Sequence, residues 1–238
     1  MLFTGGIAPR PLGLWPSNLI NRCFFVWPDM IKTIALDFGG VVIKLNFQKA
    51  IRRFEEVGLP DVERYLNPFQ QQGFFGDLEG GRINAEEFRQ EFSRLTGREM
   101  SREECMYACM GFIESVPQSS LDTVDRLRTA GYRVVLLSNT NPYVMSWAMS
   151  SAFDGRGRGL RNYFDACYLS YACHLMKPDP EIFRFVLDNE LIRPDELLFV
   201  DDGPRNIEVA RSLGIQALLT TDAESWPAEV EQILQSRQ

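Results

Sequence analysis

The stretch TIALDFGGVV, residues 33–42, decides the fold of this chain. Its residues 34–36 form a short apolar run, which is typical of a strand buried on both faces in a parallel sheet. Because burying a lone carboxylate is costly, we expect Asp37 to lie at the carboxyl end of the strand, where open α/β sheets bind ligands. Gly39 and Gly40 allow a sharp turn and a close approach of backbone N–H groups to an anion. Taken alone, the stretch also fits a strand that ends in a simple turn.

The composition is that of an ordinary globular protein. At 238 residues the chain is long enough for one domain, or for a domain with a small insert. A net charge of −7 and a pI near 4.9 exclude a general nucleic-acid binder. No apolar run reaches the roughly 18 residues that a spanning helix needs. We therefore expect neither a nucleic acid nor a membrane as partner, and a phosphate site must be built from local donors.

The cysteines do not predict a disulfide framework, because they are odd in number and scattered. A metal site at Cys105 and Cys109 would need more ligands than the neighbouring sequence offers. Free thiols in a reducing compartment are the better interpretation, which predicts a cytoplasmic protein. The five residues concerned are Cys23, Cys105, Cys109, Cys167 and Cys173.

Residues 1–29 differ from the rest of the chain. They contain four prolines and show no clear periodicity, and Asp29 is their only acidic residue. The prolines interrupt the continuous apolar stretch that a secretory signal requires. We expect this segment to be a leader outside the core.

Residues 46–117 have helical patterns and predict a small helical cap inserted after the first strand. Asn84 with Glu87, and Ser101 with Glu104, form capping-box patterns at the starts of two of the predicted helices. The glycine-rich segment 70–82 predicts a mobile lid, in which Phe74 and Phe75 either select the substrate or pack the cap. The predicted helices span 47–57, 62–69, 84–95 and 101–112.

The remaining chain alternates between helices and strands, which predicts right-handed crossovers and a parallel sheet. Residues 30–45 and 118–238 would form this Rossmann-like α/β core. The predicted strands span 133–137, 166–170, 197–200 and 215–219, with helices at 121–130, 142–150, 180–189, 205–213 and from 224.

Polar residues follow several of these strands. Ser138 and Asn139 follow the second strand of the core, and Asp201 and Asp202 follow the fourth, whereas Lys177 precedes a predicted helix. Each has a plain explanation alone, as a helix cap or a solvated charge. Together, at one edge of a parallel sheet, they form a more specific pattern. The carboxylates are suitable ligands for Mg²⁺. The hydroxyl, the N–H groups and the ammonium are suitable donors to a phosphoryl group. Asp37 could then act as a nucleophile.

These motifs resemble the haloacid dehalogenase superfamily of hydrolases, and the likeness covers residues 31–220. The resemblance rests on Asp37-Phe-Gly-Gly-Val, Ser138-Asn-Thr, Lys177-Pro and Asp201-Asp202, and on the position of the helical cap. It extends to bacterial sugar-1-phosphate phosphatases, which share the Asp-x-Gly motif.

The resemblance implies a role for each matched position. Asp37 would be the nucleophile and Lys177 its catalytic partner. The phosphate would be bound by Phe38, Gly39, Ser138, Asn139 and Lys177, and Mg²⁺ by Asp37, the Gly39 carbonyl, Asp202 and Asp201.

Gly39 is a departure from the family pattern. Most phosphatases of the family have a second aspartate there as general acid, which is typically worth about 10²–10⁴-fold. Without it, we expect anomeric and aryl phosphates to react faster than esters of primary alcohols. A positive φ would be a further reason for glycine at this position.

Three functions remain open at this point. The first is a Mg²⁺-dependent phosphatase of a small phosphorylated metabolite, such as a sugar phosphate. The second is a 2-haloacid dehalogenase, against which the acidic pair Asp201–Asp202 counts. The third is a non-catalytic phosphate-binding protein on the same fold, which Gly39 suggests. The sequence does not predict the oligomeric state.

Overall fold

A computed structural model describes residues 31–66 and 72–236 of the chain. Their centre is a parallel five-stranded sheet in the order β5-β4-β1-β6-β7, so the strand that opens the chain lies in the middle. The expected Rossmann-like α/β architecture is confirmed. The expected leader, residues 1–29, lies outside the described residues. The strands are β1 (Thr33–Leu36), β4 (Arg133–Ser138), β5 (Ala166–Leu169), β6 (Leu197–Asp201) and β7 (Gln216–Leu219).

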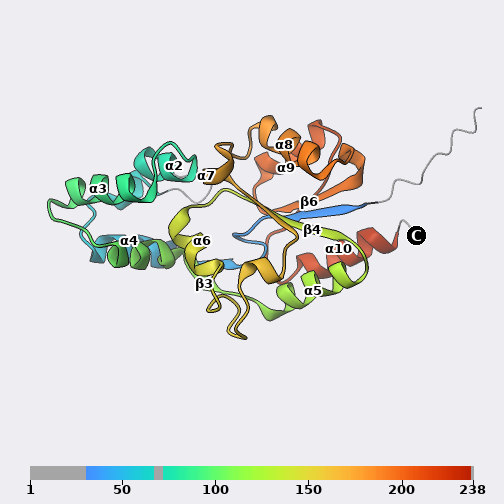
Figure 1. Cartoon of the computed structure of the whole chain (residues 1–238), viewed down its shortest axis with the longest axis horizontal. Coiled ribbons are helices and arrows are strands. Elements are labelled where there is room, and N and C mark those ends of the chain that lie inside the picture. Colours follow the sequence, from blue (N-terminus) through green and yellow to red (C-terminus); the bar gives the residue numbers. More distant parts are fainter. Residues whose placement is uncertain (1–30, 67–71, 237–238) are drawn as a thin grey trace, which may run out of the picture.

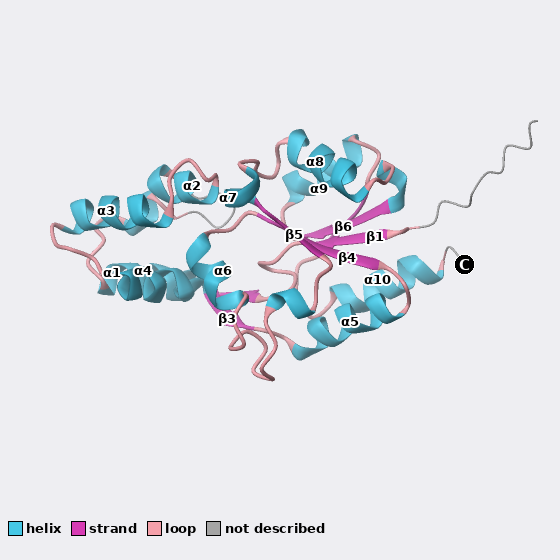
Figure 2. Ribbon diagram, in the orientation of Figure 1, coloured by secondary structure: helices cyan, strands magenta, loops and turns pink. Residues whose placement is uncertain are grey.

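The sheet is covered by helices on both faces (Figures 1 and 2). Successive side chains of a strand point to opposite faces, and β1 accordingly contributes to two cores. Leu36 packs with α5 (Gln118–Thr129) and α10 (Trp226–Gln235), whereas Ala35 packs with α8 (Pro180–Glu190) and α9 (Pro204–Ser212). This double burial explains the uncharged run before Asp37.

The C-terminal helix is tied to the turn that follows β1. The indole Nε1 of Trp226 donates a hydrogen bond of 2.9 Å to the Val41 carbonyl. The side chain of Trp226 is fully buried, so this bond forms away from competing water. This bond therefore fixes the start of α10 against the turn that follows Asp37.

Helices α1, α2, α3 and α4 form a separate layer beyond the carboxyl edge of the sheet (Figure 1). They lie between β2 (Lys44–Leu45) and β3 (Ile113–Ser115), which pair antiparallel at the base of this layer. Both predicted capping boxes are present, at Asn84 and Ser101. These helices are Phe47–Glu56, Gly73–Glu79, Ala85–Thr96 and Arg102–Cys109.

Of the two alternatives for Phe74 and Phe75 in the glycine-rich segment, the structure supports packing of the cap and not a mobile lid. The segment forms helix α2, in which Phe74 and Phe75 are only 7% and 3% exposed. Their rings lie 4.9 and 5.0 Å from that of Phe88 on α3. A single turn of helix places both phenylalanines and Leu78 toward the neighbouring helices, so they pack the cap.

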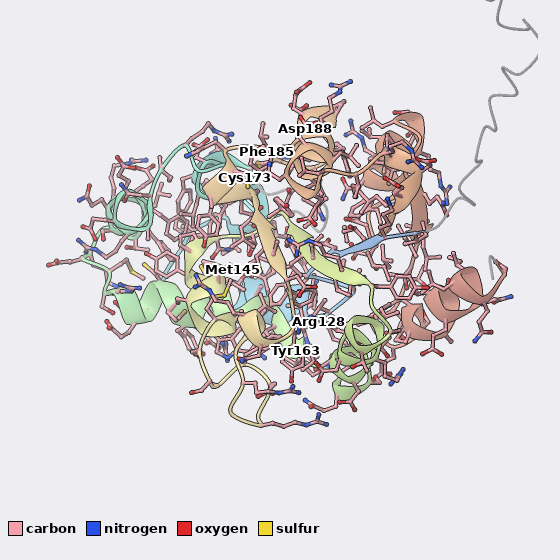
Figure 3. All side chains as sticks on the ribbon, turned by 45° about the vertical axis from the view of Figure 1, so that its right-hand side comes forward. Arg128, Met145, Tyr163, Cys173, Phe185 and Asp188 are labelled. Carbon is pink, nitrogen blue, oxygen red and sulfur yellow. The ribbon has the colours of Figure 1, made fainter. Side chains whose placement is uncertain are left out.

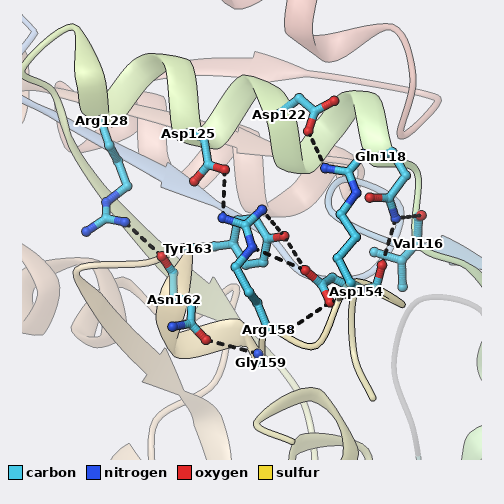
Figure 4. A network of polar contacts seen from close by, with 11 residues as sticks. Val116, Gln118, Asp122, Asp125, Arg128, Asp154, Arg158, Gly159, Asn162 and Tyr163 are labelled. Carbon is cyan, nitrogen blue, oxygen red and sulfur yellow. Dashed lines mark hydrogen bonds and ion pairs between the residues drawn. The ribbon is translucent and has the colours of Figure 1, made fainter. Parts of the chain in front are cut away.

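The long loop between α6 (Pro142–Ala148) and β5 is organised by one buried carboxylate (Figure 4). Asp154 accepts hydrogen bonds from the Tyr163 hydroxyl at 2.6 Å and from the Arg156 and Arg158 backbone N–H groups at 2.7 and 2.9 Å. Although burial opposes the charge, these bonds hold the pKa of Asp154 below its ordinary value. Arg158 links this carboxylate to Asp125 on α5.

The remaining elements are short. Helix α7 (Ser170–Cys173) follows β5. Within the described ranges, no helix is long and apolar enough to cross a bilayer. The 3₁₀ helices are η1 (Val62–Arg64), η2 (Met110–Phe112), η3 (Leu160–Asn162) and η4 (Pro194–Glu196), and the part of the predicted helix 62–69 beyond residue 66 lies outside the described residues.

Candidate active site

The carboxyl ends of the three central strands bring the predicted site residues together. β1 and β4 are in register at Leu36 and Leu136, and β1 and β6 at Leu36 and Val200. Asp37, Ser138 and Asp201 therefore emerge at the same edge of the sheet. Parallel pairing turns residues far apart in sequence into neighbours.

Lys177 lies at the centre of this group. Its Nζ is 2.9 Å from Asp37 Oδ1 and 2.6 Å from Asp201 Oδ2, and it donates to the Leu137 carbonyl at 2.9 Å. The side chain is only 1% exposed. A buried ammonium is tolerated because it is paired and hydrogen-bonded, and its two carboxylate partners keep its pKa raised although burial opposes this.

Asn139 fixes the backbone that carries this lysine. Its side-chain amide donates to the Lys177 carbonyl at 2.8 Å, and its side-chain oxygen accepts from the Lys177 N–H at 2.9 Å. One side-chain N–H and the side-chain oxygen of Asn139 thereby orient the segment that carries Lys177.

Asp37, Asp201 and Asp202 offer oxygen atoms that all lie within 4.8 Å of one another. Burial, partly opposed by Lys177, raises the pKa of Asp37, and with the added effect of the charges on Asp201 and Asp202 it reaches about 7. Partial burial and then Asp201 raise the pKa of Asp202 to about 6. Three carboxylates around one ammonium leave an excess of negative charge, and their hard oxygen donors fit a divalent cation such as Mg²⁺.

The two carboxylates at the end of β6 differ in their surroundings. Asp201 is fully buried, and its Oδ1 accepts from the Gly203 N–H at 2.6 Å and from Asn206 Nδ2 at 2.8 Å. Since its Oδ2 contacts Lys177, both of its oxygens are engaged. Asp202 is more exposed and its oxygens are available to a ligand.

The positive φ expected at Gly39 occurs instead at Gly40, where φ is +73°. A Cβ at Gly40 would lie 2.2 Å from Asp202 Oδ2, so glycine lets the backbone pass close to that carboxylate. A Cβ at Gly39 would lie 2.8 Å from Leu45 Cδ1, the end of a flexible and partly exposed side chain. The constraint on Gly39 is therefore a contact rather than a strained backbone.

Phe38 and Ser138 complete the end of the site nearest the sheet. The Phe38 N–H donates to Asp37 Oδ1 at 2.6 Å, while its ring is buried against Phe153. Ser138 does not cap the following helix, because Asn141 does so by accepting from the Val144 N–H at 3.1 Å. The alternative of Ser138 as a simple helix cap is thus excluded.

A cavity of about 560 Å³ opens from these residues toward the cap. Asp37, Ser138, Lys177 and Asp202 line its inner end. Residues that the sequence analysis missed also line it, and they are Gln72, Glu79, Phe112, Ile113 and Arg205. Glu79 lay in the segment interpreted as a loop. Because helix α2 was not predicted, no pattern in the sequence pointed to the unfavourable place of Glu79 at a helix end.

Comparison with known proteins agrees with this geometry. The haloacid dehalogenase-like hydrolase family model matches residues 31–214. D-ribitol-5-phosphate phosphatase of Bacteroides thetaiotaomicron is 42% identical over 207 residues, which cover 87% of this chain and 100% of that protein.

Solved structures are also similar. A predicted HAD-like family hydrolase from Porphyromonas gingivalis has a TM-score of 0.81 at 41% identity, covering 86% of this chain and 98% of that one. A HAD family enzyme of Bacteroides thetaiotaomicron, solved with magnesium and inorganic phosphate, has a TM-score of 0.76 at 35% identity, covering 82% and 97%. The chain therefore belongs to the haloacid dehalogenase-like hydrolases.

Proposed function

We propose that this chain is a Mg²⁺-dependent phosphatase that hydrolyses the phosphate monoester of a sugar or sugar alcohol. The observation that carries the proposal is Lys177 Nζ, held 2.9 Å from Asp37 and 2.6 Å from Asp201 at the inner end of the cavity. A fixed ammonium beside a carboxylate nucleophile is an arrangement suited to phosphoryl transfer, which depends mainly on positioning and charge stabilisation.

In this proposal Asp37 attacks the phosphorus atom. Its Oδ1 is held by Lys177 and by the Phe38 N–H, which leaves Oδ2 as the oxygen available for attack. A bond forms between Oδ2 and phosphorus, and the bond from phosphorus to the leaving oxygen breaks. That oxygen keeps the electron pair and takes a proton from water, and a second water molecule then hydrolyses the aspartyl phosphate to inorganic phosphate and the free carboxylate. Lys177 and Ser138 bind the phosphoryl oxygens, assisted by the backbone N–H groups of Gly39 and Asn139. The N–H of Phe38, also expected to bind phosphate, is instead engaged by Asp37 Oδ1.

The residues that would hold Mg²⁺ are Asp37, Asp202 and the Gly39 carbonyl. Asp201 would support the site indirectly, because both of its oxygens are engaged by neighbouring donors. When bound, the ion supplies positive charge that offsets the charge on the phosphoryl group.

Two substrate types are candidates within this class. The similar protein of Bacteroides thetaiotaomicron is named for D-ribitol 5-phosphate, the ester of a primary alcohol. The glycine at position 39 instead predicts anomeric esters such as a hexose 1-phosphate. The anomeric oxygen is a better leaving group, so its departure depends less on a general acid. Free thiols at Cys105, Cys109, Cys167 and Cys173 are compatible with the cytoplasmic location proposed for such an enzyme.

Release of inorganic phosphate and of halide tests the proposal. The panel contains D-ribitol 5-phosphate, a hexose 1-phosphate, a hexose 6-phosphate, an aryl phosphate and 2-chloropropionate, each with Mg²⁺ and with EDTA. We expect phosphate release only with Mg²⁺. Halide release without metal would support the dehalogenase alternative, and binding of phosphate without any turnover would support the non-catalytic alternative.

A further inference from the structure

The proposed phosphatase mechanism leaves one carboxyl group in the cavity unused. Glu79 is the last residue of helix α2 and lines the cavity from the cap side. It does not belong to the cluster of carboxylates at the end of the sheet. Among the described residues, its carboxyl group has no hydrogen-bond or ion-pair partner.

The position of Glu79 is unfavourable for folding. The C-terminal end of a helix carries partial negative charge, which disfavours an acidic side chain there. Burial and then the charge of Asp37 raise the pKa of Glu79 to about 8. An unpartnered, partly buried carboxyl group destabilises the native state, and such local conflicts are expected at functional sites.

The backbone next to Glu79 packs closely against helix α7 and the residue that follows it. Helix α2 lies beside α7 (Figures 1 and 2). At Gly81, where φ is +68°, a Cβ would lie 2.4 Å from the Tyr171 carbonyl oxygen and 2.7 Å from His174 Nδ1. This close contact holds the end of α2 at a fixed position over the cavity rather than on a mobile lid.

The cap wall around Glu79 is mostly apolar. Phe112 and Ile113 line it, and Gln72 adds an amide. A pocket of this kind orients its ligand through a few polar groups. A carboxyl group accepts hydrogen bonds from hydroxyl groups in either protonation state, and carbon chains that bear hydroxyl groups present such donors in series.

We propose that Glu79 determines specificity by hydrogen bonding to hydroxyl groups of the leaving alcohol. The substrate class is then the phosphate monoesters of polyhydroxylated carbon chains, in preference to simple alkyl phosphates. This inference rests on the proposed phosphatase function.

The test compares D-ribitol 5-phosphate with n-pentyl phosphate, which has the same chain length and no hydroxyl groups. The ratio of their kcat/KM values is measured in one preparation, so that the fraction of active protein cancels. Glu79→Ala and the volume-conserving Glu79→Met should each lower this ratio at least about tenfold, because sites built for a hydroxyl group discriminate strongly against analogues that lack it. Glu79→Gln, which keeps a hydrogen-bonding side chain, should retain most of the ratio.

Glu103→Ala provides a matched control, because Glu103 is an exposed glutamate on helix α4 of the same cap. It should leave the ratio unchanged. An unchanged ratio in Glu79→Ala or Glu79→Met, with both esters still hydrolysed, would overturn the role of Glu79 alone. A wild-type protein that releases phosphate from no ester in the presence of Mg²⁺ would overturn the phosphatase function instead.

Discussion

Lys177 controls the charge balance of the site at the scale of single residues. It neutralises one of the carboxylates that surround it, and the others remain in mutual repulsion. Asp37 lines the cavity beside this ammonium, with Oδ1 restrained by two donors. Its environment therefore prepares one oxygen for reaction and fixes the other.

Asp37→Asn should abolish phosphate release, because the neutral amide is a far weaker nucleophile. The side-chain shape is kept, so the fold and the melting temperature should be preserved. Initial rates and thermal melts measure both effects. Asp188→Asn, on the outer surface of α8 (Figure 3), serves as the control. Near-wild-type turnover by Asp37→Asn would rule out this nucleophile.

Gly40→Ala should be far more harmful than Gly39→Ala. Alanine at position 40 meets both a left-handed backbone and Asp202 Oδ2 at 2.2 Å. We expect a loss of about 1–3 kcal/mol in the free energy of unfolding and at least about a hundredfold in kcat/KM. At position 39 only the end of Leu45 has to move. Denaturant melts and kinetics of both variants measure the difference, and a greater loss in Gly39→Ala would contradict the geometry.

The sequence predicted which residues meet but not how each of them is used. The strand ends predicted the convergence of Asp37, Ser138 and Asp201, because parallel pairing fixes that edge. Lys177 was expected to reach the same edge from the start of a helix. Which of two adjacent glycines has a positive φ depends on packing against Asp202, a residue 162 positions away. Such a contact between residues far apart in sequence cannot be predicted from the residues next to Gly39 and Gly40.

At the scale of elements, the long loop before β5 depends on Asp154. Tyr163, Arg156 and Arg158 all donate to this one carboxylate (Figure 4). The loop closes against α5 through Arg158 and Asp125. The hydrogen bonds to this one ionised side chain therefore hold the loop in a fixed conformation.

The contribution of Asp154 should disappear at low pH. Its pKa is lower in the folded state than in the unfolded chain, so its stabilisation is complete above the unfolded value of about 3.9 and is lost as the pH falls below it. Asp154→Asn should therefore melt well below the wild type at pH 7, and the gap between the two melting temperatures should narrow progressively as the pH falls below about 3.9. Thermal melts across this range measure the gap. A gap that stays constant with pH would show that the charge is unimportant.

The elements themselves differed in how far they could be predicted. Strands and capped helices were predicted to within a few residues, because short apolar runs and capping boxes leave local signals. Helix α2 was missed because Gly73 and Gly76 disfavour a helix intrinsically. Packing of Phe74 and Phe75 against α3 overrides that preference, and such packing is a tertiary effect.

At the scale of the whole molecule, the acidic cluster joins β1 to β6 and should make stability depend on Mg²⁺. A ligand that binds only the native state stabilises it by about 2.7 kcal/mol at 100 times its Kd. For a chain of this size we expect the melting temperature to rise by about 5–10 °C. Asp202→Ala should remove both this rise and the turnover, whereas Asp188→Ala should keep them. Thermal melts with Mg²⁺ and with EDTA measure this effect for each variant. A Mg²⁺-dependent rise in melting temperature that persists in Asp202→Ala would show that the ion binds elsewhere.

The hydrogen bond from Trp226 to Val41 has a consequence for how the protein is made. Ribosomes synthesise a chain from its amino-terminal end, and domains fold as their parts emerge. The turn after Asp37 is among the first described residues to appear, yet its indole anchor lies 185 residues later. β1 also waits for β6, its second neighbour in the sheet. Assembly of the site therefore waits until α10 has been synthesised, and a nascent chain that lacks α10 carries the nucleophile in a turn without its indole anchor.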